Sequence, residues 1–167
     1  MKCRVIFNDN LKPVMTYHAN ISWVKGLSEA FTDNKYSREH MWVFDGGVEV
    51  KASSSPHVVP LPHSVEDAVD PEEAFVASLS SCHMLWFLSI AAGEGFVVEM
   101  YADNAEGVLA KDENGKLAMT KVRLSPQTTF SGSYQPTRQQ IEELHHRAHS
   151  KCFIANSVRT SIEIVPR

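Results

Sequence analysis

Residues 70–92 read DPEEAFVASLSSCHMLWFLSIAA, and this stretch decides the fold. Asp70 can cap free N–H groups, and Pro71 suits the first position of a helix. The two glutamates that follow favour the positive end of the helix dipole. Apolar side chains then surround most of the axis as far as Ala92, so a surface helix with one buried face is excluded. We expect this helix to be central or to be covered by a second subunit.

Strand patterns precede this helix. Residues 15–24 alternate apolar and polar side chains, which is typical of a half-buried strand. Two shorter segments, 41–44 and 48–52, flank the turn Asp45-Gly46-Gly47 and predict two more strands. The stretch 53–69 carries three prolines among scattered polar residues and predicts a loop.

After the helix, strand-like segments cover 96–109 and 117–130, and Asn114-Gly115 between them is a strong hairpin signal. Thr137 followed three residues later by Gln140 forms a capping box that predicts a helix through about Ser150. Alternation over 158–165 predicts a last strand. With no repeat, low-complexity segment or linker, the order predicts one α+β domain over residues 1–167.

Composition narrows the function classes. The chain has 167 residues, 43% apolar and 22% charged, with a net charge of -4, which matches one globular domain. No cluster of Lys and Arg favours nucleic acid or an anionic membrane as a partner. The longest apolar run, 84–92, is too short to span a bilayer, and no signal peptide precedes it, so we expect a cytoplasmic protein. Three cysteines without paired spacing do not form a secreted disulfide framework.

Two cysteines are the candidates for chemistry. Cys82 lies mid-helix among small hydroxyl residues, and Cys152 completes an apolar stripe at the end of the second helix, so it faces the core. Either could act simply as a small buried hydrophobic residue. A rival interpretation is a zinc site made by His145, His149 and Cys152, although solvated histidines on a polar face explain His145 as well. A serine nucleophile elbow, a phosphate loop and a dinucleotide fingerprint are all absent.

The order of several short motifs resembles the OsmC/Ohr family of osmotically induced and organic hydroperoxide resistance proteins. The likeness covers about Thr16 to Val165. It rests on Tyr36-Ser37-Arg38-x-His40 and Gly46-Gly47, on Ala52-Ser53-x-Ser55-Pro56 and Asp70-Pro71-Glu72-Glu73, and on Ser80-Ser81-Cys82-His83 and Ala148-His149-x-Lys151-Cys152 with Asn156. Many hydroperoxide-specialised members have an apolar aromatic residue after the cysteine. The histidine at this position, His83, therefore makes the chain resemble an OsmC-like branch of the family instead. Residues 1–13, including Cys3, have no counterpart and form an N-terminal extension.

The resemblance implies an α+β fold with antiparallel sheets and central cysteine-bearing helices, assembled as an intertwined homodimer. It also implies a peroxidase for organic hydroperoxides, and also for hydrogen peroxide. Cys82 matches the peroxidatic cysteine and Cys152 the resolving one. Arg38 matches the arginine that stabilises the thiolate. Glu72 matches the carboxylate that positions that arginine. No cofactor or metal is implied, and an external dithiol of lipoyl type would supply the electrons.

The spacing of Glu72 and Cys82 adds a geometric condition. The ten residues between them correspond to about 15 Å along a helix, so the two cannot meet within one unbroken helix. Either the helix breaks, or Arg38 and Glu72 serve the Cys82 of the partner subunit, which is the arrangement we expect. The alternative function is a small-molecule or thiol binding protein of the same fold without efficient turnover.

Overall fold

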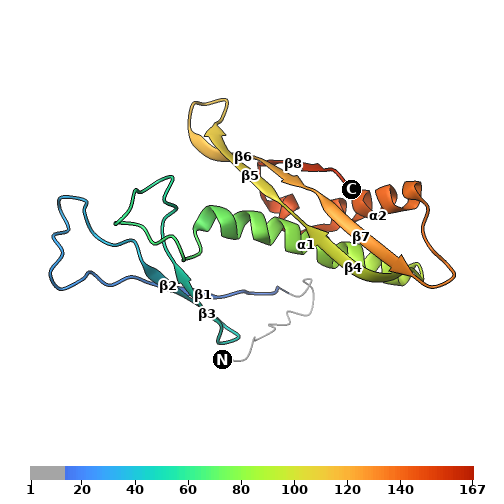
Figure 1. Ribbon diagram of the computed structural model, residues 1–167, viewed down its shortest axis with the longest axis horizontal. Helices are drawn as coiled ribbons and strands as arrows, with labels where there is room; N and C mark the ends of the chain where they lie inside the picture. The colour runs from blue at the N-terminus through green and yellow to red at the C-terminus, as the bar shows by residue number, and fades with distance from the viewer. Residues whose placement is uncertain (1–13) are drawn as a thin grey trace. The chain divides into compact units, whose positions relative to one another are not determined.

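The computed structural model describes residues 14–167, so Cys3 and the expected N-terminal extension lie outside the described residues. The chain divides into two compact units, one ending at Pro71 and the other comprising Glu72–Arg167. Figure 1 shows the elements of both along the chain, and each unit is described by itself.

The first unit is built on a three-stranded antiparallel sheet. Its strands are β1 (Ala19–Ser22), β2 (His40–Phe44) and β3 (Glu49–Ala52), in the order β1-β2-β3. The turn between β2 and β3 has Gly47 at φ 83, a conformation that favours glycine. β1 is shorter than the predicted strand. The predicted loop 53–69 returns to the sheet, where the Ser53 N–H donates to the Val69 carbonyl at 3.0 Å.

This first unit has almost no hydrophobic core of its own. Within residues 14–71 the only apolar side chain that is buried is Ala52. Large apolar side chains on its strands and loops are exposed, among them Tyr17, Ile21, Val24 and Phe31. A small sheet needs a hydrophobic face packed against something else to be stable, so this unit requires a covering surface.

The second unit is organised around α1 (Pro71–Gly93), which begins at the proline as predicted. The helix runs unbroken for 23 residues and buries Leu79, Phe87 and Ile90. By length and apolar composition alone this helix could also cross a membrane. The run 84–92 considered from the sequence is shorter than the whole apolar helix. The central helix of a folded domain meets the same criterion, and α1 contributes to both hydrophobic clusters of its unit.

Two small sheets accompany α1. β4 (Val97–Asp103) pairs with β7 (Pro126–Ser131), and β5 (Glu106–Lys111) pairs with β6 (Leu117–Leu124), both antiparallel. β8 (Ser161–Ile164) joins β6 in parallel. Figure 1 shows β4 and β7 side by side.

The strands predicted over 96–109 and 117–130 are each interrupted, and that prediction of continuity was wrong. The break falls where the Asp103 carboxylate accepts a hydrogen bond from the Ser125 backbone N–H at 2.6 Å. The same carboxylate accepts the Ser80 hydroxyl of α1 at 2.5 Å. The Ser125 N–H is therefore bonded to a side chain instead of a neighbouring strand, at the point where the chain passes from one sheet to the other.

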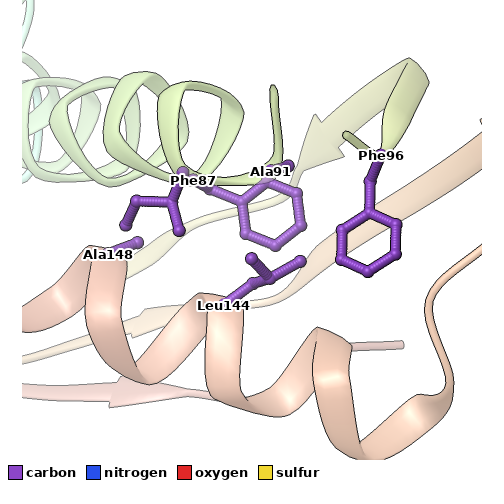
Figure 2. Packing of buried hydrophobic residues seen from close by; sticks show 6 residues of the cluster. Phe87, Ala91, Phe96, Leu144 and Ala148 are labelled. Carbon is purple, nitrogen blue, oxygen red and sulfur yellow. The ribbon is translucent and has the colours of Figure 1, made fainter. Parts of the chain in front are cut away.

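The predicted capping box is confirmed at the start of α2 (Arg138–Lys151), where Thr137 and Gln140 exchange side-chain and backbone hydrogen bonds. A short 3-10 turn, η1 (Ala155–Ser157), follows α2. Figure 2 shows Leu144 and Ala148 of α2 pointing toward α1, where Phe87 and Ala91 complete the cluster with Phe96. The two helices thus share one hydrophobic core.

Candidate functional site

Cys82 lies midway along α1, half-buried, and opens onto a cavity of about 490 Å³. Leu85 and Trp86 of α1 and Phe153 and Ile154 beyond α2 form its apolar walls, together with Ser78, Ser81 and Ser89. The hydroxyls of Ser78 and Ser81 donate to carbonyls of their own helix, which leaves the wall beside the sulfur largely apolar. The small side chains of Ser78 and Ser81 leave room beside the thiol.

Cys152 is the residue that caps the C-terminus of α2, and it is 1% exposed, so the predicted core position is confirmed. Burial raises the pKa of its thiol to about 11, and the neighbouring Cys82 acts in the same direction. This effect requires Cys82 to lie beside the Cys152 thiol. The Ala155 N–H donates to the Cys152 Sγ at 3.4 Å. The fold therefore brings the two thiols into contact.

Glu72 lies in the first turn of α1, and the continuity of that helix removes one of the two geometric alternatives. Because the helix does not break, Glu72 and Cys82 of one chain stay about 15 Å apart along its axis. Glu72 is not among the residues that line the Cys82 cavity.

Arg38 lies in the first unit, in the segment before β2, and is half-buried rather than a bare surface residue. Its guanidinium donates to the Asn34 side-chain oxygen at 2.7 Å and to the Asn34 carbonyl at 3.0 Å. It also donates to the Tyr36 carbonyl and lies 3.9 Å above the centre of the Tyr36 ring. Asn34 adopts a positive φ of 61, which turns the loop so that both of its oxygens face the arginine.

Sequence reasoning missed a buried histidine pair. His83 Nε2 lies 3.0 Å from His145 Nδ1, and the two rings are nearly parallel, at 5°. His145 is 3% exposed, so the expectation that it is solvated was wrong. The signal was present, because His145, Ala148 and Cys152 follow each other at helical spacings of three and four, on one face.

Both members of this pair stay uncharged at neutral pH. Burial lowers the pKa of His83 to about 4, with the neighbouring His149 acting in the same direction and Asp103 opposing it. Burial also lowers the pKa of His145 to about 4, and His83 adds to the effect. Two neutral imidazoles share one N–H···N hydrogen bond.

The zinc arrangement of His145, His149 and Cys152 does not form. No group of three or more His, Cys, Asp or Glu side chains among residues 14–167 is placed to hold a metal ion. His145 directs its Nδ1 at His83, and the Cys152 thiol is engaged with Cys82.

Comparison with known proteins places this chain in a family. The family described as OsmC-like protein matches residues 64–167. An OsmC-like protein of unknown function from Vibrio cholerae is 58% identical, with a TM-score of 0.91 over 92% of this chain and 100% of its own. No curated protein matches in sequence.

More distant structures share the fold. An organic hydroperoxide resistance protein from Elizabethkingia anophelis is 19% identical, with a TM-score of 0.67 over 93% of this chain and 96% of its own. The organic hydroperoxide resistance protein OhrB of Bacillus subtilis is 17% identical, with a TM-score of 0.66 over 92% and 98%. The family match and the near relative show that this chain belongs to the OsmC family.

Proposed function

We propose that the protein is a cysteine-based peroxidase that reduces organic hydroperoxides and also hydrogen peroxide, in the cytoplasm. The observation that carries the proposal is the placement of Cys82, which opens onto an apolar cavity and lies beside the buried Cys152. Membership of the OsmC family and the shared fold with organic hydroperoxide resistance proteins support a peroxide-related role.

In this mechanism the Cys82 thiolate attacks the terminal peroxide oxygen. The O–O bond breaks, the sulfur becomes a sulfenic acid, and the alkoxide leaves with a proton as an alcohol. The Cys152 thiol then attacks the sulfenic sulfur, so that a disulfide forms and water leaves. An external dithiol, of lipoyl type, reduces the disulfide and is itself oxidised.

The two sulfurs differ in a way that supports these roles. Cys82 is half-buried and lines the cavity, so a peroxide can reach it. Cys152 is buried, and its raised pKa keeps it a thiol, which is a poor nucleophile toward peroxide. Cys152 is nevertheless in contact with the sulfur on which the sulfenic acid would form, which suits a resolving residue.

A homodimer completes this proposal. The first unit needs a covering surface, and Leu85 of α1 is 62% exposed beside Cys82. We propose that a second copy of the chain supplies the cover. Because Glu72 cannot reach the Cys82 of its own helix, Arg38 and Glu72 would then serve the Cys82 of the partner subunit, where the guanidinium stabilises the thiolate and the carboxylate orients the guanidinium.

Peroxide consumption by cysteine variants tests the chemistry. Cys82→Ser should abolish turnover of cumene hydroperoxide, whereas Cys3→Ser, which removes the third cysteine, should leave it unchanged. After one equivalent of peroxide, the intact mass of the wild type should fall by two hydrogens, mapped to Cys82 and Cys152. Unchanged turnover in Cys82→Ser would refute the proposal.

Mixing inactive variants tests the assignment across subunits. A heterodimer of Cys82→Ser with Arg38→Ala has one site that combines an intact Cys82 from one chain with an intact Arg38 from the other. Activity should therefore recover only if the arginine acts on the partner. The matched control mixes Arg38→Ala with Glu72→Gln. In that heterodimer one site lacks Arg38 and the other lacks Glu72, so activity should stay low.

The second candidate is a binding protein that uses the same cavity for an apolar or thiol ligand. The largely apolar lining of the cavity is the observation that favours it. Slow, stoichiometric oxidation of Cys82 with no preference for organic over hydrogen peroxide would support this function over peroxidase activity.

A further inference from the structure

We propose that His83 and His145 are positioning residues whose mutual hydrogen bond fixes α1 against α2 in the register that allows Cys82 and Cys152 to form a disulfide. The inference rests on the proposed function for the use of this cysteine pair. It assigns a role to two buried histidines that the peroxidase chemistry does not touch.

The two contacts join the same two helices, at adjacent residues of α1 and about 10 Å apart along α2. His83 is the residue after Cys82 on α1, and His145 lies two turns before Cys152 on α2. The imidazole nitrogens are 3.0 Å apart, and Cys82 lies close enough to Cys152 to raise the pKa of its thiol. Since helices move as rigid elements, a register fixed at the histidines is transmitted to the sulfurs.

The surroundings hold the rings in place. The Phe87 ring stacks on His145, with centroids 4.3 Å apart, and His83 is 1% exposed. Outside this pair, Arg147 and Glu94 form an ion pair near the end of α1, but both side chains are more than a third exposed and are screened by solvent. The histidine hydrogen bond is therefore a directional contact in the dry part of the interface.

The pair is costly, which argues for a role other than stability. Each neutral imidazole has a second ring nitrogen, and the outer atoms, His83 Nδ1 and His145 Nε2, are buried without a hydrogen-bond partner among residues 14–167. An unpaired buried polar atom costs about 1–3 kcal/mol. Two leucines would fill a similar volume without that cost, but the contact between them would have no preferred direction and would not fix the register. A buried polar contact can specify the register of two helices while it lowers their stability, and the histidine pair combines the same two properties.

The experiment measures the redox equilibrium of the cysteine pair with glutathione, without peroxide. The two thiols and one oxidised glutathione yield the protein disulfide and two reduced glutathiones, and intact mass after alkylation gives the ratio of the two protein forms. In H83L/H145L the equilibrium constant for disulfide formation should fall at least about tenfold, which is about 30 mV for a two-electron couple. Its melting temperature should stay equal to that of the wild type or rise.

A conservative variant should rescue the equilibrium. In H83Q/H145N the glutamine amide nitrogen occupies the place of His83 Nε2, and the asparagine oxygen that of His145 Nδ1, so the hydrogen bond persists. The constant should return to within about threefold of the wild type. His146→Gln, an exposed histidine on the same helix, is the matched control and should change nothing.

Two results would overturn the inference. One is a leucine pair that melts earlier yet keeps the wild-type constant, because the histidines would then be structural only. The other is a failure of H83Q/H145N to restore the constant. If the leucine pair does not fold, His83→Gln against His83→Asn gives the same comparison, since the shorter amide cannot reach the Nε2 position. Peroxide assays decide the proposed function separately, because this equilibrium contains no peroxide.

Discussion

The thiol of Cys152 lies beside Cys82, which raises its pKa, although one residue ends α2 and the other lies in the middle of α1. This contact makes the second step of the proposed reaction intramolecular, which favours it over attack by a free thiol in solution. The lifetime of a sulfenic acid on Cys82 should therefore depend on Cys152.

Cys152→Ser tests that dependence. After one equivalent of cumene hydroperoxide, the variant should hold a sulfenic acid that dimedone traps, and its turnover with a dithiol should fall by about tenfold or more. The wild type should give little adduct under the same conditions. Equal dimedone labelling of the two proteins would show that Cys152 does not resolve the intermediate.

The histidine pair predicts a loss of stability in acid. In the folded protein the pKa values of His83 and His145 are about 4, whereas the ordinary value is 6.5. The unfolded chain therefore binds protons first, so stability is complete above about pH 6.5 and declines as the pH falls toward 4. The free energy of unfolding in urea should drop by roughly 2–5 kcal/mol by pH 4.5. H83L/H145L should lack most of this decline, and an equally steep decline there would exclude the pair as its cause.

Gly107 of β5 marks a close approach between the sheet and α1. A Cβ at this position would lie 2.5 Å from Val76 Cγ2 and would also meet the Met119 side chain. Met119 can move its flexible end, but the branched Val76 cannot, so Gly107→Ala should lower the free energy of unfolding by about 1–3 kcal/mol. Gly46→Ala, where a Cβ would meet nothing within 4 Å, is the control. Equal urea midpoints for the two variants would contradict this account.

Phe153 forms the outer wall of the Cys82 cavity, where its ring meets Trp86 edge-on at 5.5 Å. Truncation in Phe153→Ala removes apolar surface that a bulky peroxide would cover, so KM for cumene hydroperoxide should rise about five- to thirtyfold. Hydrogen peroxide makes no such contact, and its kinetics in the same variant should match those of the wild type. A parallel change with both substrates would point to a disturbed Cys82 instead.

Local signals in the sequence predicted the elements that depend on local interactions. The start of α1 at Pro71, the capping box at Thr137 and the hairpin turn with Gly115 at φ 75 each follow from residues within a few positions of one another. The interruption of the long strands did not follow, because it depends on Asp103 reaching Ser125 from far along the chain.

The site shows the same division. Helical spacing placed Cys152 on the buried face, but a spacing contains no distance between helices, so contact with Cys82 had to come from the fold. The burial of His145 was missed because a histidine beside an apolar stripe fits either a wet or a dry face. What decides between them is the partner ring of His83.

Because Cys152 caps α2, the redox state of the cysteine pair would also affect the backbone around it. Helix ends fray, and here α2 ends at this buried residue, whose carbonyl accepts a hydrogen bond from the Asn156 N–H of the following η1. A covalent bond to the middle of α1 would anchor that end. Amide protons from Ser150 to Ser157 would then exchange with solvent more slowly in the oxidised protein, so the backbone itself would record which form of the cysteine pair is present.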